Sequence, residues 1–343
     1  MQRLGTTTIG AIALSLFSAG AAWADPPPPP QVTLRVATQA PKGTVWMDAL
    51  TDIKATVARG TKGRVQLEYF ANGSQGDEKA VIERMQVGVM HGGLFTGIGL
   101  GEILPEVRIL ETPFLFESKA EIDAVKAALE EEFTQGFDAK GFVFLGWAEV
   151  GWAYIFSKVE ARTLEEIRQR KVWVWQGDPL AERCFQVFGL SGVPLPLTDV
   201  LTALETGMID SVYNAPYGLV GLQWHRNVRY MSRMTVGHGT GALLIAKKEW
   251  VKIPPPVRTR IASAARTRLD TLLEEVETKN EETTEELKRN GMKVVPIPAE
   301  EMPTYLELGN QLADAMVGKL WSADLLARVR KIVAETRARE QGK

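Results

Sequence analysis

Segments of alternating polarity and stretches of helical periodicity follow one another along most of this chain. Residues 32–37 and 65–70 alternate apolar and polar side chains, as β-strands with one buried face do. Between them, apolar residues recur every three to four positions, as on one face of a helix. The fully apolar run 242–246 is typical of a strand that is covered on both faces. This alternation predicts an α/β fold with mostly parallel sheets.

A long helix is predicted near the C-terminal end of this pattern. Helical periodicity runs from Val257 to about Asn290 without an internal Gly or Pro. At 1.5 Å per residue such a helix is roughly 50 Å long, which exceeds the width of one small domain. The chain of 343 residues is also longer than a typical single domain. We therefore expect two lobes, with the long helix bridging both of them.

The strand predicted at residues 171–175 carries two tryptophans. Trp173 and Trp175 lie on the same face of it, because side chains alternate along a strand. Gly177-Asp178-Pro179 ends the strand, and a helical pattern follows. Ligands of open α/β sheets bind beyond the carboxyl ends of the strands. The two rings are therefore candidates for ligand binding, although each could instead be a core residue under a neighbouring helix.

The N-terminal segment indicates the compartment. Residues 1–24 combine an early charge at Arg3, an apolar run and the small residues Ala22 and Ala24, which is the pattern of a cleavable secretory signal peptide. Residues 25–31 form a proline-rich linker. No later stretch is apolar over the about 18 residues of a membrane-spanning helix, so we expect a soluble periplasmic protein. The net charge of −2 gives no argument for a nucleic-acid partner.

Signatures of catalysis are missing from the sequence. Gly97-Ile-Gly99-Leu-Gly101-Glu102 has glutamate where a dinucleotide-binding loop needs its third glycine. His91, His225 and His238 are far apart and lack Cys or carboxylate partners at metal-ligand spacing. Cys184 is the single cysteine, and its spacing is that of a buried, inert position on a helix. We expect no catalytic activity, cofactor or metal; a periplasmic enzyme of unknown type stays an alternative.

Several motifs occur together in an order that resembles one family. Gln75-Gly76-Asp77-Glu78, Pro113-Phe114-Leu115-Phe116 and the block from Pro194 to Asp210 resemble elements of the solute-binding subunits (DctP family) of TRAP transporters, the tripartite ATP-independent periplasmic transporters. The resemblance covers about residues 32–320. It implies a two-lobed α/β periplasmic binding protein of the Venus-flytrap type. Such a protein binds a small molecule between its lobes and hands it to small and large integral membrane subunits.

The lobes implied by this resemblance can be assigned to segments of the chain. Lobe I would comprise residues 32–150 and 239–280, and lobe II residues 151–238 and 281–343 with the bridging and C-terminal helices. The chain would cross between them near Val150–Gly151 and again near Gly237–Gly239.

One position departs from the family in a way that bears on the ligand. Most members have Gly-x-Lys-x-Arg, whose arginine binds the ligand carboxylate in a bidentate pair, but this chain reads Arg170-Lys171-Val172-Trp173. Tryptophan offers one N–H group and a large apolar face. Burying a carboxylate without paired donors is costly. We therefore expect a neutral, apolar or amphipathic ligand. In this respect the chain resembles a TRAP subgroup that works with a tetratricopeptide-repeat lipoprotein, which would be a further partner.

The predicted ligand-binding residues lie at strand ends, at the first strand–helix junctions and on one helix. They are Lys42, Trp46, Gln75, Glu78, Trp152, Tyr154, Trp173, Trp175, Tyr213, Asn214, Gln223 and Trp224. Two other functions stay open at this point. The ligand could be an ordinary organic acid, such as a dicarboxylate or keto acid, held by Lys42 or another base. The chain could also be a protein-interaction partner without small-molecule cargo.

Overall fold

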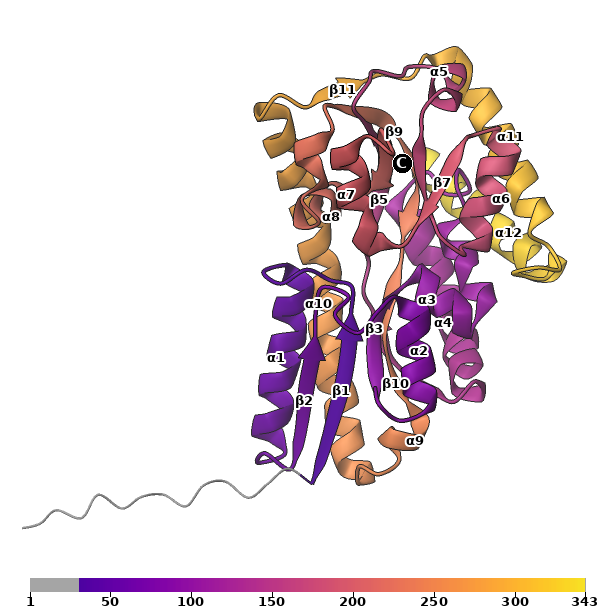
Figure 1. Ribbon diagram of the computed structural model, residues 1–343. Coiled ribbons are helices and arrows are strands. Elements are labelled where there is room, and N and C mark those ends of the chain that lie inside the picture. The colour runs from indigo at the N-terminus through magenta and orange to yellow at the C-terminus, as the bar shows by residue number, and fades with distance from the viewer. Residues whose placement is uncertain (1–30, 343) are drawn as a thin grey trace, which may run out of the picture.

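The computed structural model describes residues 31–342 and shows two lobes, each built around one β-sheet (Figure 1). The predicted signal peptide and nearly all of the proline-rich linker lie outside the described residues. The first sheet has the order β2 (Val65–Phe70), β1 (Val32–Thr38), β3 (Gly92–Thr96), β10 (Gly241–Ala246), β4 (Phe142–Trp147). The second has the order β11 (Lys293–Val295), β9 (Tyr230–Gly239), β5 (Gly151–Ser157), β8 (Ser211–Asn214), β6 (Val172–Trp175), β7 (Gly192–Leu195).

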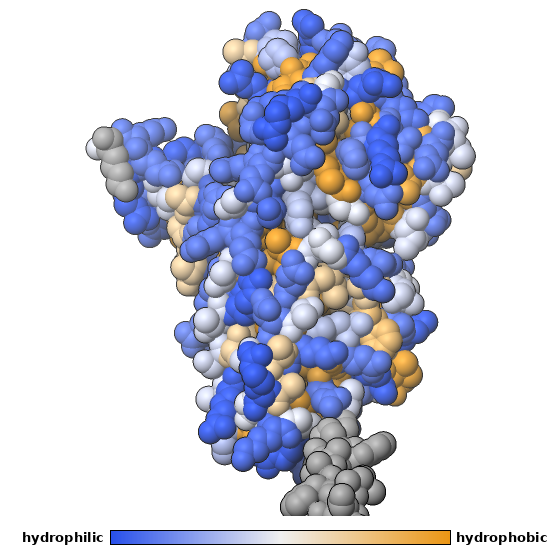
Figure 2. Space-filling model, turned by 90° about the vertical axis from the view of Figure 1, so that its left-hand side faces the viewer, coloured by the Kyte–Doolittle hydropathy of each residue, from blue (hydrophilic) through white to orange (hydrophobic). Residues whose placement is uncertain are grey.

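Helices cover both sheets. In chain order they are α1 (Val45–Gly60), α2 (Glu78–Gln86), α3 (Gly97–Ile103), the 3-10 helix η1 (Pro105–Glu111), α4 (Lys119–Ala139), α5 (Leu164–Arg168), α6 (Pro179–Phe188), η2 (Leu197–Asp199), α7 (Val200–Thr206), α8 (Pro216–Gly221), η3 (Trp224–Asn227), α9 (Lys247–Trp250), α10 (Pro255–Arg289), η4 (Ala299–Glu301), α11 (Met302–Ala315) and α12 (Ala323–Gln341). The face of the molecule in Figure 2 is mostly hydrophilic, with scattered hydrophobic patches.

Short polar side chains start several of these helices. Asp77, Ser118 and Thr163 each accept a hydrogen bond from a backbone N–H three residues further on, at the starts of α2, α4 and α5. These bonds satisfy N–H groups that have no partner inside the helix. Asp77, Ser118 and Thr163 thus fix the starts of three helices.

Both sheets are mixed: one strand in each, β10 and β5, runs against all the others, and the expectation of mostly parallel sheets holds for the remaining strands. β10 runs antiparallel to β3 and to β4, and β5 runs antiparallel to β8 and to β9. The reason is the way the chain crosses between the sheets. β4 of the first sheet leads directly into β5 of the second, and β9 leads back into β10. The two crossings run in opposite directions. As a result, β10 pairs antiparallel with β4 in the first sheet, and β5 pairs antiparallel with β9 in the second. Side-chain alternation reveals a strand but not its direction.

The predicted long helix is confirmed as α10, which has 35 residues. It packs against α1 and β4 in the first lobe and against α8 and β5 in the second (Figure 1). Ile261, Leu269 and Val276 are buried in the core beside the first sheet, whereas Leu287 belongs to the core beside the second. One uninterrupted helix thereby contributes to both cores.

The C-terminal helix departs from the predicted assignment of segments to lobes. We expected residues 281–343 in the second lobe, but α12 packs against α4, which covers the first sheet. Leu326 and Val329 of α12 share a core cluster with Phe133 of α4. The sequence shows that α12 is amphipathic, but its apolar face does not show which core it completes. Within residues 31–342, no helix is both long and apolar enough to cross a membrane.

Asn280 of α10 connects the bridging helix to a crossing segment by a hydrogen bond. Its Nδ2 donates to the Val150 carbonyl (3.0 Å), and its Oδ1 accepts from the Tyr217 N–H (3.0 Å). Asn280→Ala leaves these groups without their partner, so we expect the free energy of unfolding to fall by about 1–3 kcal/mol. Urea unfolding measures this change. Glu281→Ala, at an exposed position next to it, should change stability by less than about 0.5 kcal/mol. Equal effects of the two variants would contradict this role of Asn280.

Candidate functional site

A cavity of about 280 Å³ lies between the two lobes. Strands of both sheets end at it: Thr38 of β1 and Thr96 of β3 line it from the first lobe, and Trp175 of β6 and Asn214 of β8 from the second. The crossing segments at 148–151 and 237–240 also contribute to its wall. Carboxyl ends of strands are where α/β proteins place their ligands. The cavity is therefore the candidate site.

Much of the cavity wall is an apolar chamber between β5, α5, α6 and α11 of the second lobe. The side chains that form this chamber are Phe114, Ile155, Leu164, Ile167, Ala181, Cys184, Phe188, Leu190, Val236 and Tyr305. The ring of Phe114 stacks on Phe188 with 5.5 Å between centroids and lies 5.4 Å from Tyr305. Phe114 has a φ of 62°, which is costly for an aromatic residue. Packing in the chamber holds this residue of the Pro113–Phe116 motif in place.

Trp173 lies at the border between the cavity and the core. It lines the cavity, yet it is 1% exposed and stacks on Tyr213 with 5.0 Å between ring centroids. Its Nε1 donates to the backbone carbonyl of Leu195 (3.0 Å). Because this N–H group is paired and the side chain is almost fully buried, only a small part of the Trp173 ring surface reaches the cavity. Trp175, half-buried, extends that surface with its ring centroid 5.5 Å from that of Trp173.

Three other predicted ligand residues line the cavity as well: Trp46, Tyr213 and Asn214. Trp46 donates its Nε1 to the carbonyl of Glu149 in a crossing segment (2.9 Å). The Tyr213 hydroxyl accepts from the Trp175 N–H (3.3 Å), and burial raises the pKa of this phenol. Tyr213 is therefore neutral at physiological pH and part of a largely apolar wall.

Seven predicted ligand residues do not line the cavity: Lys42, Gln75, Glu78, Trp152, Tyr154, Gln223 and Trp224. The face of β5 towards the cavity carries Ala153 and Ile155, so alternation puts Trp152 and Tyr154 on the opposite face. Trp224 is buried in the core of the second lobe, and Lys42, Gln75 and Gln223 are exposed or half-exposed. The sequence predicted these positions from the expected strands and helices but did not show which way each side chain points.

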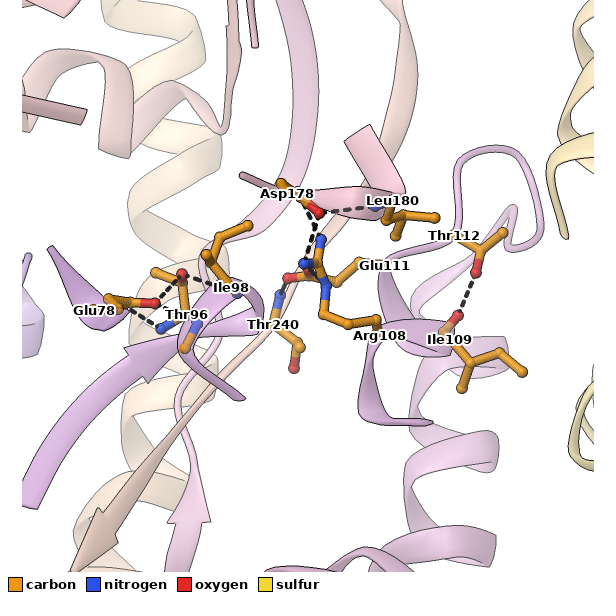
Figure 3. Close-up of polar contacts among 11 residues, drawn as sticks. Glu78, Thr96, Ile98, Arg108, Ile109, Glu111, Thr112, Asp178, Leu180 and Thr240 are labelled. Atoms are coloured by element: carbon orange, nitrogen blue, oxygen red, sulfur yellow. Dashed lines mark hydrogen bonds and ion pairs between the residues drawn. The ribbon is translucent and has the colours of Figure 1, made fainter. Parts of the chain in front are cut away.

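Glu78 does not line the cavity but hydrogen-bonds to Thr96, which does. It is 2% exposed and accepts hydrogen bonds from the Thr96 N–H (2.7 Å), the Thr96 hydroxyl (2.9 Å) and the Gly99 N–H (2.6 Å) (Figure 3). These contacts fix the junction of β3 and α3, where Thr96 faces the cavity. Burial raises the pKa of Glu78 from 4.5 to about 7, although the hydrogen bonds favour the ionised form.

A buried ion cluster at the cavity was not predicted. Nη1 and Nη2 of Arg108 in η1 donate to the two carboxylate oxygens of Asp178, both at 2.9 Å (Figure 3). Nε of Arg108 lies 3.0 Å from Glu111 Oε2, and Glu111 Oε1 accepts from the Thr240 N–H (2.7 Å). All four residues line the cavity. The only feature of the sequence that indicates this cluster is the single arginine between apolar residues. The sequence does not show that its partner, Asp178, lies 70 residues away.

The charges of this cluster decide what the cavity can hold. Arg108 is the one Lys or Arg among the cavity-lining residues, within the part of the chain that the structure describes. Burial alone would lower its pKa, but the carboxylates of Asp178 and Glu111 outweigh that effect and raise it. Burial raises the pKa of Glu111, opposed by Arg108. A single cation thus faces two carboxyl groups. Each of the three guanidinium nitrogens lies within 3.0 Å of a carboxylate oxygen.

Residues 36–319 match the family model of DctP, bacterial extracellular solute-binding protein, family 7. The chain belongs to this family. The membership predicted from the motifs is thereby confirmed, and the protein is a TRAP-type periplasmic solute-binding protein from a family of transport proteins that work with membrane subunits. The subgroup associated with tetratricopeptide repeats stays a prediction.

Relatives in the DctP family cover most of the chain. A solute-binding protein of Verminephrobacter eiseniae is 25% identical over 268 residues, which is 77% of this chain and 79% of the relative. The C4-dicarboxylate-binding periplasmic protein DctP of Rhodobacter capsulatus is 20% identical over 341 residues, 97% of this chain and 99% of that protein.

A solved structure confirms the two-lobed α/β fold. The sugar acid binding protein DctPAm from Advenella mimigardefordensis, in complex with galactonate, matches with a TM-score of 0.83 at 20% identity. The match covers 90% of this chain and 99% of that one. DctP7 of Bordetella pertussis, which binds pyroglutamic acid, matches with a TM-score of 0.81 at 20% identity over 88% and 99% of the two chains. These similarities concern the fold.

The raised pKa of Glu78 predicts a specific pH dependence of stability. Between about pH 4.5 and 7 the folded protein holds the proton of Glu78, whereas the unfolded chain releases it. The contribution of Glu78 is therefore fully present below pH 4.5 and is lost as the pH rises through 7. Relative to Glu78→Gln, which does not titrate, the wild type should lose about 1–3 kcal/mol of unfolding free energy between pH 5 and 8. Urea unfolding at several pH values measures this difference.

Glu68→Gln, on an exposed position of β2, is the matched control, because it removes a carboxylate that has no buried partners. We expect its stability to follow that of the wild type across the same pH range. A constant difference between the wild type and Glu78→Gln from pH 5 to 8 would show that Glu78 does not titrate in this interval.

Proposed function

We propose that this protein captures an uncharged, largely apolar small molecule in the periplasm and delivers it to TRAP membrane subunits. One observation carries the proposal. The cavity combines an apolar chamber with a single cation, Arg108, that is already paired with Asp178 and Glu111. An apolar ligand gains about 25 cal/mol for each Å² of surface that it buries in such a chamber.

Trp173 supports the same class of ligand. It stands where most of the family have the arginine that binds a ligand carboxylate, and its N–H group is bonded to Leu195. A ligand here meets the half-buried ring of Trp175 and the small exposed part of Trp173, which suit hydrocarbon or an aromatic group. The volume of about 280 Å³ is at the lower end for ligand pockets, which favours a small molecule.

Ordinary organic acids are the main alternative, since relatives bind galactonate or pyroglutamic acid. An acid in this cavity would need a free basic partner. Lys42, which the sequence offered for this role, is exposed and does not line the cavity. A carboxylate buried near Asp178 and Glu111 would meet like charges and lose its hydration without compensation. The geometry therefore favours a neutral ligand over an acid.

The proposal predicts how a blocked chamber changes binding. Ala181 faces the chamber from α6, one turn before Cys184, so Ala181→Phe places a ring in the space for the ligand. We use N-phenyl-1-naphthylamine as probe, because it is neutral and apolar and fluoresces more strongly out of water. The wild type should bind one equivalent, and Ala181→Phe should weaken binding at least tenfold, or about 1.4 kcal/mol. Fluorescence titration measures both affinities.

Ala128→Phe provides the control, since Ala128 is exposed on α4 and the same ring is added there. Its affinity for the probe should equal that of the wild type. Mass spectrometry of molecules released from the purified protein by denaturation gives an independent measure, and we expect a neutral, apolar compound. A released sugar acid, or one-to-one binding of galactonate without any binding of the probe, would contradict the proposal.

A further inference from the structure

Arg108 and Asp178 reach each other from opposite sides of the cavity. Arg108 belongs to η1, which packs against α3 and α4 beside the first sheet. Asp178 begins α6 after the last strand residue of β6, Trp175, in the second sheet. Their side chains are 6% and 4% exposed, and both line the cavity. The pair is thus a buried contact between the two lobes at the place where a ligand would bind.

We propose that Asp178 determines ligand specificity by acting as an internal counter-ion for Arg108. Its carboxylate occupies the guanidinium fork that would otherwise be free to bind the carboxylate of a ligand. This inference deepens the proposed function and relies on it for the class of ligand. Asp178 thereby excludes acids from a scaffold whose relatives bind them.

The geometry of the pair is the one that a bound acid would adopt. Two parallel hydrogen bonds of 2.9 Å join Nη1 and Nη2 of Arg108 to the two oxygens of Asp178. Bidentate pairing of this kind is how arginine recognises carboxylates. Since Nε faces Glu111 at 3.0 Å, all three nitrogens of the guanidinium are beside carboxylate oxygens. An acid would have to displace Asp178 before it could use this fork.

Asp178 is held in place independently of Arg108. Its Oδ1 accepts a hydrogen bond from the Leu180 N–H (3.0 Å) and caps α6, a helix of 10 residues. The positive end of the helix dipole further favours the negative charge. A free acid pays translational and rotational entropy to reach the fork, whereas Asp178 is already there. Asp178 therefore competes successfully against an acid of similar chemistry, and the same pair links the lobes without a ligand carboxylate.

The test frees Arg108 while the helix cap is kept. Asp178→Ser removes the carboxylate, and serine caps helices about as well as aspartate. Octanoate and 1-octanol are the probes, because they share the chain and differ in the charged group. The wild type should bind 1-octanol more tightly than octanoate. In Asp178→Ser the affinity for octanoate relative to 1-octanol should rise at least tenfold in calorimetric titrations at pH 8. The double variant Arg108→Gln/Asp178→Ser should lose this gain.

Asp77→Ser is the matched control, because Asp77 caps α2 on the surface, away from the cavity. It should leave both affinities at the wild-type values. If circular dichroism shows that Asp178→Ser does not fold, Asp178→Asn replaces it, since asparagine keeps both the cap and the volume.

The outcomes separate this inference from the proposed function. A folded Asp178→Ser or Asp178→Asn variant that keeps the wild-type ratio of affinities, or that binds no octanoate, overturns the role of Asp178. If the wild type binds no 1-octanol but the variant gains octanoate through Arg108, the role of Asp178 stands and the apolar cargo is wrong.

Discussion

A buried guanidinium must have its charge compensated, and this requirement shapes the centre of the molecule. Arg108 satisfies it with Asp178 from the other lobe and with Glu111 from its own helical turn. Taking these charges out of water costs several kcal/mol per ion. Removing one partner would therefore leave a buried charge without compensation. Glu111 in turn binds the Thr240 N–H, in the segment that carries the chain back from β9 to β10. The cluster thus connects η1, α6 and a crossing segment around one cavity.

The rest of the cavity follows from how the chain passes between the sheets. β4 and β5 lead across in one direction, and β9 and β10 lead back beside them. This arrangement brings the carboxyl ends of parallel strands from both sheets to the same space. α10 supports it by contributing to both cores, and Asn280 of that helix binds the crossing segment at Val150. The cavity wall therefore includes a crossing segment that is hydrogen-bonded to the helix shared by both cores.

Sequence patterns predicted the parts of this structure that depend on local spacing. The long helix follows from a period of 3.6 residues, and the shared face of Trp173 and Trp175 follows from a period of two. Other features depend on contacts across the fold. The face of β5 that turns towards the cavity, the antiparallel crossing strands and the packing of α12 on α4 leave no local pattern. Arg108 and Asp178 are 70 residues apart, so their pairing required the folded chain.

In the proposed function, Trp173 and Asp178 together favour an uncharged ligand over an acid. An arginine restored at position 173 would lie among Tyr213, Trp175 and Trp224, with the Leu195 carbonyl as the acceptor that the tryptophan now uses. A guanidinium there would be desolvated among aromatic rings, and a ligand carboxylate would be needed to compensate it. Arg108 already has such compensation in Asp178. In this proposal, an aromatic side chain stands at position 173, and the carboxylate of Asp178 occupies the guanidinium fork of Arg108. Each of these two features removes a reason for an acid to enter, and the proposed ligand binds mainly through the apolar chamber beside them.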